Sequence, residues 1–419
     1  MLVERVKAIQ SSCSKSAIFS LDVLMKPCRS SSRALKEMFV LLVRYPCFMS
    51  DSTFSGTHLE QEILDAPQAV AATLSAHSGQ HGTLELHGCD LSDFALRTVR
   101  SVVITACGSA LNVAYMAKYV LEHWCLIPVA VQSASELRYC DAVYDSRTMC
   151  IAISQSGETM DTLMAMRHLA EQGATTLAIV NAPRSTIARE AGAVLCTYAG
   201  SEYAVASTKS FCAQLAAVYI LALSIAHARK VKTKEDIAAY MQELSDIERH
   251  MHTVLERTDQ IQAVAREYSH MDRALVMGRR TDYPVALEGA LKLKELAYVH
   301  AQACPAGELK HGSIALVEPG SDLIVFAPSL RRPLLHSKVV SGLAAIHEYQ
   351  PHILLIADDG DHTADAYVDH IIRIPADVPV LMRPFVAVPA MQILACSLAK
   401  LGEHNLDTPR NLAKIFTSD

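Results

Sequence analysis

A short segment late in the chain groups side chains that could move protons on a small anionic substrate. Glu288, Lys292 and Glu295 stand four and then three residues apart. This spacing puts two carboxylates and an ammonium on one face of a helix predicted from Pro284 to His300. After a turn comes His311, so a base, an acid and a cation lie close together in sequence, as proton transfer requires. A surface helix stabilised by an i,i+4 ion pair has the same pattern, and the segment alone leaves both interpretations open.

Two loops in the first half of the chain could hold a phosphate group. Cys107–Ser109 follows an apolar run and precedes a predicted helix, and Ser154–Thr159 has the same setting further along. Free N–H groups and the dipole at a helix N-terminus attract anions, and hydroxyl groups add donors. The plain alternative is an N-cap at Ser156 with Glu158 in the first turn. Neither loop matches GxxxxGK[ST] or GxGxxG, so nucleotide binding is not predicted.

Apolar strands that alternate with helices must position these loops. Such strands between helices predict a parallel sheet covered on both faces. The second half of the chain repeats the order of the first, about 170 to 180 residues later. We therefore predict an α/β protein with two tandem copies of one unit, each a parallel sheet flanked by helices in a flavodoxin-like three-layer sandwich. The predicted strands are 102–104, 129–131, 150–153, 177–180 and 194–197, then 274–277, 323–326 and 353–356.

The same pattern divides the chain into segments. Residues 232–270 are polar and helical in pattern, which is typical of a linker between the two copies. The predicted segments are an unassigned N-terminal part at 1–57, a helical lead-in at 58–94, the first copy at 95–231, the linker at 232–270, the second copy at 271–400 and a tail at 401–419.

Composition restricts the class of protein. Of 419 residues, 51% are hydrophobic and 20% are charged, and the net charge is -6, as in an ordinary globular protein. Basic residues are scattered, so no nucleic-acid partner is expected. The longest apolar run, Leu215–Ala226, is too short to span a bilayer and predicts a buried helix. Without a signal-peptide pattern or a His/Cys metal motif, we expect a cytoplasmic protein that binds no membrane, metal or cofactor.

Five motifs resemble one family closely. They are SQSGET at 154–159, VASTK at 205–209, EGALKLKE at 288–295, AGELKHG at 306–312 and PRNLAK at 409–414. Together they resemble the isomerase half of glutamine–fructose-6-phosphate amidotransferase, or glucosamine-6-phosphate synthase, from about residue 59 to the C-terminus. The resemblance implies two sugar isomerase (SIS) domains, which agrees with the internal duplication.

The resemblance also implies catalytic roles. Glu295 would move a proton between C1 and C2 of the sugar, and Lys292 would support the enolamine. His311 would open the sugar ring from the neighbouring subunit of a homodimer, and Lys414 would form a Schiff base with the ketone. A Schiff base needs a neutral amine, which burial or a nearby cation such as Arg410 would favour.

Further positions are implied for substrate binding. The residues expected to hold the sugar phosphate are Cys107, Gly108, Ser109, Ser154, Gln155, Ser156, Thr159, Val205, Ser207 and Ala413. The chain departs from the family pattern at Ala110, where a hydroxyl is usual, and at Ser313, where a proline is usual.

The family's glutaminase domain has no counterpart in residues 1–50. The leading hypothesis is therefore an enzyme that makes glucosamine 6-phosphate from fructose 6-phosphate, with ammonia that is free or comes from a separate glutaminase. One alternative is a glucosamine-6-phosphate deaminase or a simple phosphosugar isomerase. Another is a sensor of phosphosugars without catalytic activity.

Overall fold

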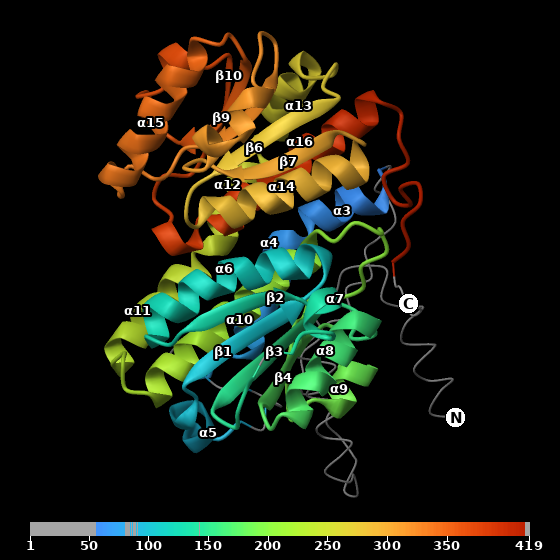
Figure 1. Cartoon of the computed structure of the whole chain (residues 1–419), viewed down its shortest axis with the longest axis vertical. Helices are drawn as coiled ribbons and strands as arrows, with labels where there is room; N and C mark the ends of the chain where they lie inside the picture. The colour runs from blue at the N-terminus through green and yellow to red at the C-terminus, as the bar shows by residue number, and fades with distance from the viewer. Residues whose placement is uncertain are drawn as a thin grey trace, which may run out of the picture. The chain divides into compact units, whose positions relative to one another are not determined.

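The structure is a computed structural model that describes residues 56–414, except 80–83, 85, 87, 88, 90 and 142. Most of the segment 1–57, which the sequence left unassigned, and the end of the C-terminal tail therefore lie outside the described residues. Within the described part, the chain forms two five-stranded sheets, in which every hydrogen-bonded pair of strands runs parallel (Figure 1).

Both sheets have the same strand order. The first is β2-β1-β3-β4-β5 and the second is β7-β6-β8-β9-β10, which is the flavodoxin-like order 2-1-3-4-5 in each case. The predicted duplication of one α/β unit is therefore confirmed. The strands are β1 (Ser101–Ala106), β2 (Val129–Ser133), β3 (Thr148–Ser154), β4 (Thr175–Val180), β5 (Ala193–Cys196), β6 (Arg273–Gly278), β7 (His300–Pro305), β8 (Asp322–Phe326), β9 (His352–Asp358) and β10 (His370–Ile374).

Helices cover both faces of each sheet. In Figure 1, α6 and α14 run between the two sheets, while α8, α9 and α15 cover outer faces. The α-helices are α3 (His58–Leu64), α4 (Ala66–Ala76), α5 (Asp93–Thr98), α6 (Gly108–Cys125), α7 (Ala134–Leu137), α8 (Met160–Glu171), α9 (Thr186–Glu190), α10 (Lys209–Ala228), α11 (Lys234–Ser245), α12 (Ile247–Leu255), α13 (Thr258–Glu267), α14 (Asp282–Leu296), α15 (Pro333–His347) and α16 (Pro384–Leu401). Short 3-10 turns are η3 (Leu309–His311), η4 (Ser313–Leu316), η5 (Asp365–Tyr367) and η6 (Val380–Met382).

The two copies share one apolar core, to which each sheet contributes the side chains of one face. Ile104 and Ile151 of the first sheet and Ile324 of the second belong to the same large apolar cluster, together with α6, α10, α14 and α16. Their neighbours Val103 and Leu323 face the opposite way, into smaller clusters under the outer helices. Because side chains alternate across a strand, each sheet contributes one face to the shared core.

The two most apolar helices are part of this core. By length and composition alone, α10 and the stretch Val380–Leu401 around α16 could cross a membrane. However, 94% of the apolar window in α10 and 89% of that in the second stretch are buried inside the protein. The run from Leu215 to Ala226 lies within α10, so the prediction of a buried helix is confirmed.

Helix α14 is shorter than the sequence predicted. It ends at Leu296, and the segment from His300 belongs to strand β7, which pairs with β6. Between them, Tyr298 adopts a left-handed conformation with φ of 55°. The apolar spacing of Ala297 and Tyr298 therefore does not continue the helix, because pairing along β6 satisfies the backbone groups that follow.

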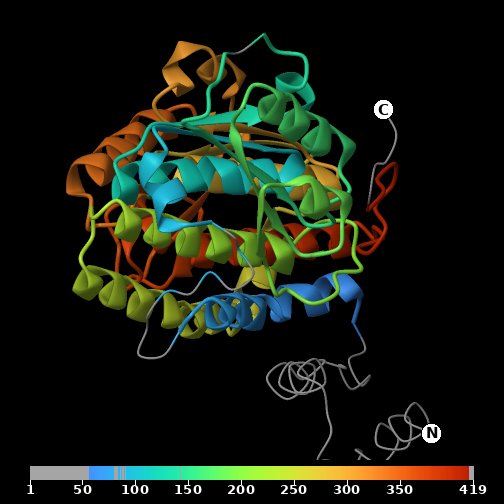
Figure 2. The same cartoon turned by 90° about the horizontal axis from the view of Figure 1, so that it is seen from below.

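The start of the described chain packs beside its end. The predicted helical run from His58 is interrupted at Asp65, just before Pro67 at the start of α4. Figure 2 shows the resulting α3 and α4 (blue) beside the central helices, and α3 contacts α16 (red). The carboxylate of Asp407 accepts hydrogen bonds from the backbone N–H groups of His58 and Leu59, at 3.2 and 2.8 Å. The first turn of α3 therefore fixes the path of the C-terminal tail.

Candidate active site

One face of α14 presents a charged triad in a buried setting. The Nζ atom of Lys292 lies 2.5 Å from Oε2 of Glu295 and 3.5 Å from Oε1 of Glu288. Burial alone would lower the pKa of Lys292, but the two carboxylates outweigh it and raise that pKa. Burial also raises the pKa of Glu288, against the effect of Lys292. The ammonium is thus held in its charged form between two carboxylates, of which Glu295 is the more exposed.

Glu288 connects the two copies. Its Oε1 atom accepts a hydrogen bond from Oγ of Ser109 at 3.0 Å, and its Oε2 atom accepts one from Nδ2 of Asn112 at 2.8 Å. Both donors lie in the first two turns of α6, which begins within the loop Cys107–Ser109. The hydroxyl that the resemblance assigns to the sugar phosphate therefore contacts a carboxylate of the second copy in this structure.

The loop 154–159 is organised by its own hydroxyl groups. Oγ of Ser154 lies 2.9 Å from Oγ1 of Thr159 and accepts a hydrogen bond from the backbone N–H of Gly157 at 3.0 Å. Oγ of Ser156 accepts one from the N–H of Glu158 at 3.2 Å. The backbone carbonyl of Gln155 accepts a hydrogen bond from the N–H group that directly follows β4, and this bond ties the loop to that strand. These contacts give a short loop lined with hydroxyl groups at the start of α8.

Both predicted loops flank the point where the strand order reverses. Cys107 follows β1 and Gln155 follows β3, and these two strands are neighbours. In flavodoxin-like sheets, ligands bind at this point outside the carboxyl ends of the strands. The position suits a phosphate that approaches the N-termini of α6 and α8 together.

The tail brings Lys414 to a carboxylate that the sequence did not single out. Its Nζ atom donates to Oε2 of Glu202 at 2.8 Å and to the backbone carbonyl of Ala204 at 2.6 Å. Next to this contact, the N–H of Val205 donates to the carbonyl of Asp407 at 2.9 Å. Lys414 therefore lies against the segment that contains Val205 and Ser207, while Ala413 is exposed.

Glu202 is buried and holds its segment in place. Its Oε1 atom accepts backbone hydrogen bonds from Thr208 and Ser210 at 3.0 and 3.1 Å, at the start of α10. Its charge also contributes to the raised pKa of Lys292. One carboxylate thus influences both lysines that the resemblance assigns to catalysis. The only sequence signal is that Glu202 is the single acidic residue between Glu190 and Glu235.

Two residues that the sequence analysis named are not bonded to the groups described above. His311 is exposed at the end of η3, and no hydrogen bond or ion pair joins it to Glu295, Lys292 or Lys414 in the described part of the chain. Arg410, the cation expected beside Lys414, lies over the ring of Tyr298, with its Cζ atom 4.0 Å from the ring centroid. The partner of Lys414 is a carboxylate rather than a second cation.

The second copy has different chemistry at the corresponding edge. A cavity beyond β6 and β8 is lined by Arg279, Arg280 and Arg332, together with the buried Thr281 and Ser329. The first copy offers hydroxyl groups and backbone donors there, and the second offers guanidinium groups. The duplicated units therefore differ in the side chains at the carboxyl ends of their strands.

Comparison with known proteins places the chain in a family. The sequence matches the SIS domain over residues 95–224 and 267–401. A glutamine–fructose-6-phosphate aminotransferase (isomerizing) from Streptomyces coelicolor is 48% identical over 358 residues, which are 85% of this chain and 58% of that protein. The protein of the same name from Mycobacterium tuberculosis is 45% identical over 358 residues, 85% of this chain and 57% of that protein. The chain thus spans somewhat more than half the length of these relatives.

The solved structures agree with this assignment. The C-terminal domain of glucosamine-fructose-6-phosphate aminotransferase from Francisella tularensis matches with a TM-score of 0.80 and 32% identity, over 86% of this chain and all of that one. A glucosamine-6-phosphate deaminase from Thermotoga maritima shares the fold, with a TM-score of 0.64 and 21% identity over 86% of this chain and 99% of that one. The chain therefore belongs to the SIS domain family, as a relative of the C-terminal domain of glucosamine-fructose-6-phosphate aminotransferase.

Proposed function

We propose that this chain converts fructose 6-phosphate and ammonia into glucosamine 6-phosphate. The observation that carries the proposal is the position of Lys414, held by Glu202 against the segment next to Val205 and Ser207. A lysine amine can condense with a ketone, and a carboxylate beside it can take up the proton that the ammonium must release. The names of the relatives support the same substrate.

The charges around the site suggest the order of steps. Lys414 attacks the C2 ketone of the open sugar and forms an imine with loss of water. Ammonia then attacks the imine carbon, which releases the lysine and leaves the nitrogen on C2. Glu295 removes a proton from C1 and returns it at C2, while the ammonium of Lys292 stabilises the negative charge that develops between them. No redox step is needed, because an aldose and a ketose have the same oxidation level.

We assign the phosphate to the two loops at the β1/β3 switch point. The binding groups there are the backbone of Cys107, Gly108 and Gln155 and the hydroxyls of Ser109, Ser154, Ser156 and Thr159. Ser109 must leave Glu288 to reach a ligand, since its hydroxyl donates only one hydrogen bond. Val205, Ser207 and Ala413 would line the path of the sugar towards Lys414.

A homodimer would complete the site. His311 is exposed and forms no hydrogen bond or ion pair with Glu295, Lys292 or Lys414 of its own chain in the described residues. We therefore place it in the site of the partner subunit, where it opens the sugar ring. The nitrogen comes from free ammonia or from a glutaminase, and the reaction takes place in the cytoplasm.

The experiment is product analysis in two arms. One arm supplies fructose 6-phosphate with ammonium, and the other supplies glucosamine 6-phosphate alone. Formation of glucosamine 6-phosphate in the first arm supports the proposal, while release of ammonia only in the second arm would favour a deaminase. Borohydride reduction with fructose 6-phosphate should attach the sugar to Lys414, with a Lys400→Arg variant as a control that keeps the adduct. An adduct on another lysine would remove Lys414 from the mechanism.

A further inference from the structure

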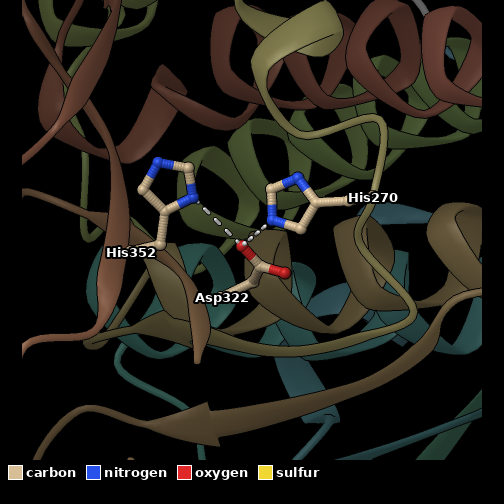
Figure 3. A group of neighbouring side chains, drawn as sticks. All are labelled: His270, Asp322 and His352. Carbon is tan, nitrogen blue, oxygen red and sulfur yellow. Dashed lines mark hydrogen bonds and ion pairs between the residues drawn. The ribbon is translucent and has the colours of Figure 1, made fainter. Parts of the chain in front are cut away.

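Two histidines and an aspartate converge at the amino ends of the second sheet. Figure 3 shows His270 and His352 on either side of Asp322, with one ring nitrogen of each directed at the same carboxylate oxygen. One ligand atom from each of the three residues lies within 4.8 Å of the others. We propose that these residues bind a divalent transition-metal ion, with zinc as the best match. The proposal does not depend on the sugar-phosphate function.

The distances fit a small tetrahedral ion. Nδ1 of His352 lies 3.3 Å from Oδ1 of Asp322, and Nε2 of His270 lies 3.6 Å from the same atom. Zinc binds histidine nitrogen and carboxylate oxygen at about 2.0–2.2 Å, and tetrahedral ligands are then separated by about 3.3–3.6 Å. Both separations from Oδ1 of Asp322 therefore match a tetrahedral zinc site, and the two histidine nitrogens lie within 4.8 Å of each other.

Regular structure fixes two of the three ligands. Asp322 is the first residue of β8 and His352 the first residue of β9, and the two are direct partners in the register of these parallel strands. His270 lies in the turn between α13 and β6, and its side chain is 58% exposed, whereas that of Asp322 is 6% exposed. The ion would thus bind to two residues fixed by neighbouring strands and be closed from the solvent side by the more exposed His270.

The charge of Asp322 requires a partner. Among the described residues, its carboxylate has no ion pair with lysine or arginine, and the side chains paired with it are those of His270 and His352. A buried carboxylate without a lysine or arginine partner is costly, and a divalent cation would offset that cost.

Two buried polar atoms next to the cluster are left without partners. Within the described part of the chain, Oη of Tyr268 and Nδ1 of His370 have no hydrogen bond. The ring of Tyr268 stacks on the ring of His352, with centroids 4.5 Å apart. The ring of His370 meets the same His352 ring edge-on, with centroids 5.9 Å apart. Buried polar groups are nearly always hydrogen-bonded. Both rings contact that of His352, so these unsatisfied groups belong to residues beside the proposed site.

The set of ligands selects the type of metal. Two imidazoles and one carboxylate with an open position suit zinc and its neighbours in the transition series, whereas magnesium and calcium prefer oxygen ligands throughout. The competing interpretation is a cluster of histidines around an aspartate that holds protons and no metal. Metal binding distinguishes the two directly.

The test measures metal binding by the full chain, which is first treated with a chelator to remove bound ions. Titration with cobalt should give the visible absorption of tetrahedral Co²⁺, and zinc should displace it at one ion per chain. Zinc should also raise the midpoint of thermal unfolding, because it binds the folded state. The matched control is His362→Gln, which changes an exposed histidine that also pairs with an aspartate, Asp365.

The variants Asp322→Asn and His352→Gln should abolish the cobalt spectrum and the thermal shift, while His362→Gln keeps both. If Asp322→Asn and His352→Gln fail to fold, the variant His270→Gln changes only the most exposed ligand. It should weaken zinc binding by about tenfold or more. A parent protein without the tetrahedral cobalt spectrum would overturn the proposal, and so would a His270→Gln protein that binds zinc as the parent does.

Discussion

At the scale of single residues, the contact between Lys414 and Glu202 supports the catalytic role that we propose for this lysine. Most lysines in a terminal tail are solvated charges, but this one donates to a buried carboxylate and to a backbone carbonyl. The pairing orients the amine, and it also provides an acceptor for the proton that must leave before attack on a ketone.

The variant Glu202→Gln tests that role. The amide oxygen can still accept from Thr208 and Ser210, so the start of α10 should remain intact. Loss of the proton acceptor should slow formation of the borohydride-trapped adduct by on the order of 10²-fold. The adduct rate is measured at saturating fructose 6-phosphate, with Glu171→Gln as a control at an exposed position. An unchanged rate would show that Glu202 only positions the tail.

The variant Ser156→Ala tests the phosphate loop. Loss of one hydroxyl donor to a charged phosphate should weaken binding of fructose 6-phosphate by about 1.5–3 kcal/mol, with a smaller effect on the rate of the chemical step. Calorimetric titration gives the affinity, and Ser337→Ala on the exposed side of α15 is the matched control. Equal affinity of the parent protein for fructose and fructose 6-phosphate would contradict the assignment of this loop.

At the scale of elements, the loop between β3 and α8 depends on a glycine for its shape. Gly157 has φ of 64°, and a Cβ atom built there would lie 1.9 Å from Oγ of Ser185. The turn therefore needs both the left-handed conformation and the absence of a side chain, which lets the hydroxyl groups of the loop face the start of α8.

Left-handed strain alone costs about 1–3 kcal/mol. Gly157→Ala should lower the free energy of unfolding by more than this strain. Gly200→Ala is the matched control, since φ is 68° there but nothing lies within 4 Å of the added Cβ atom. Urea unfolding measures both variants. Equal losses would mean that Ser185 moves aside at no cost and that conformation alone requires glycine.

At the scale of the whole molecule, the role that we propose for His311 in the partner's site would make catalysis depend on two subunits. A mixture of Glu295→Ala and His311→Ala proteins should regain activity, because a mixed dimer contains one site with both residues intact. Random exchange of subunits in equal amounts would restore about a quarter of the parent activity. Exchange without recovery, checked with tagged subunits, would place His311 outside the partner's site.

The packing of α3 makes stability depend on pH. Burial raises the pKa of Glu62 to about 7, and the charge of Glu202 adds to this effect. The usual value is 4.5, so between these two values the folded state binds the proton more tightly than the unfolded chain does. The free energy of unfolding should therefore fall as pH rises from about 4.5 to 7.

Glu62→Gln should remove this part of the pH dependence and be more stable than the parent at pH 8. The difference should be about 1–2 kcal/mol after allowance for solvent screening. Urea unfolding at pH 5 and pH 8 measures it, and the exposed Glu171→Gln should keep the slope of the parent. The same slope in Glu62→Gln would assign the pH dependence to other groups.

The sequence by itself determined the repeated α/β plan and the loops at the strand ends. Apolar strands such as 150–153 have a local signal, because burial on both faces removes polar residues from a short run. Glu288, Lys292 and Glu295 could also be grouped from spacing alone, since a helix fixes the geometry of residues three and four apart.

Only the tertiary structure decided the contacts between distant segments. The pairing of Glu202 with Lys414 joins residues 212 positions apart, and nothing in either local sequence specifies it. The end of α14 at Leu296 was decided by pairing along β6, which overrode the helical spacing of Ala297 and Tyr298. The histidine cluster around Asp322 arises because parallel strands bring their amino ends together, although the residues are scattered along the chain. Such sites depend on strand order and register, which one-dimensional spacing does not encode.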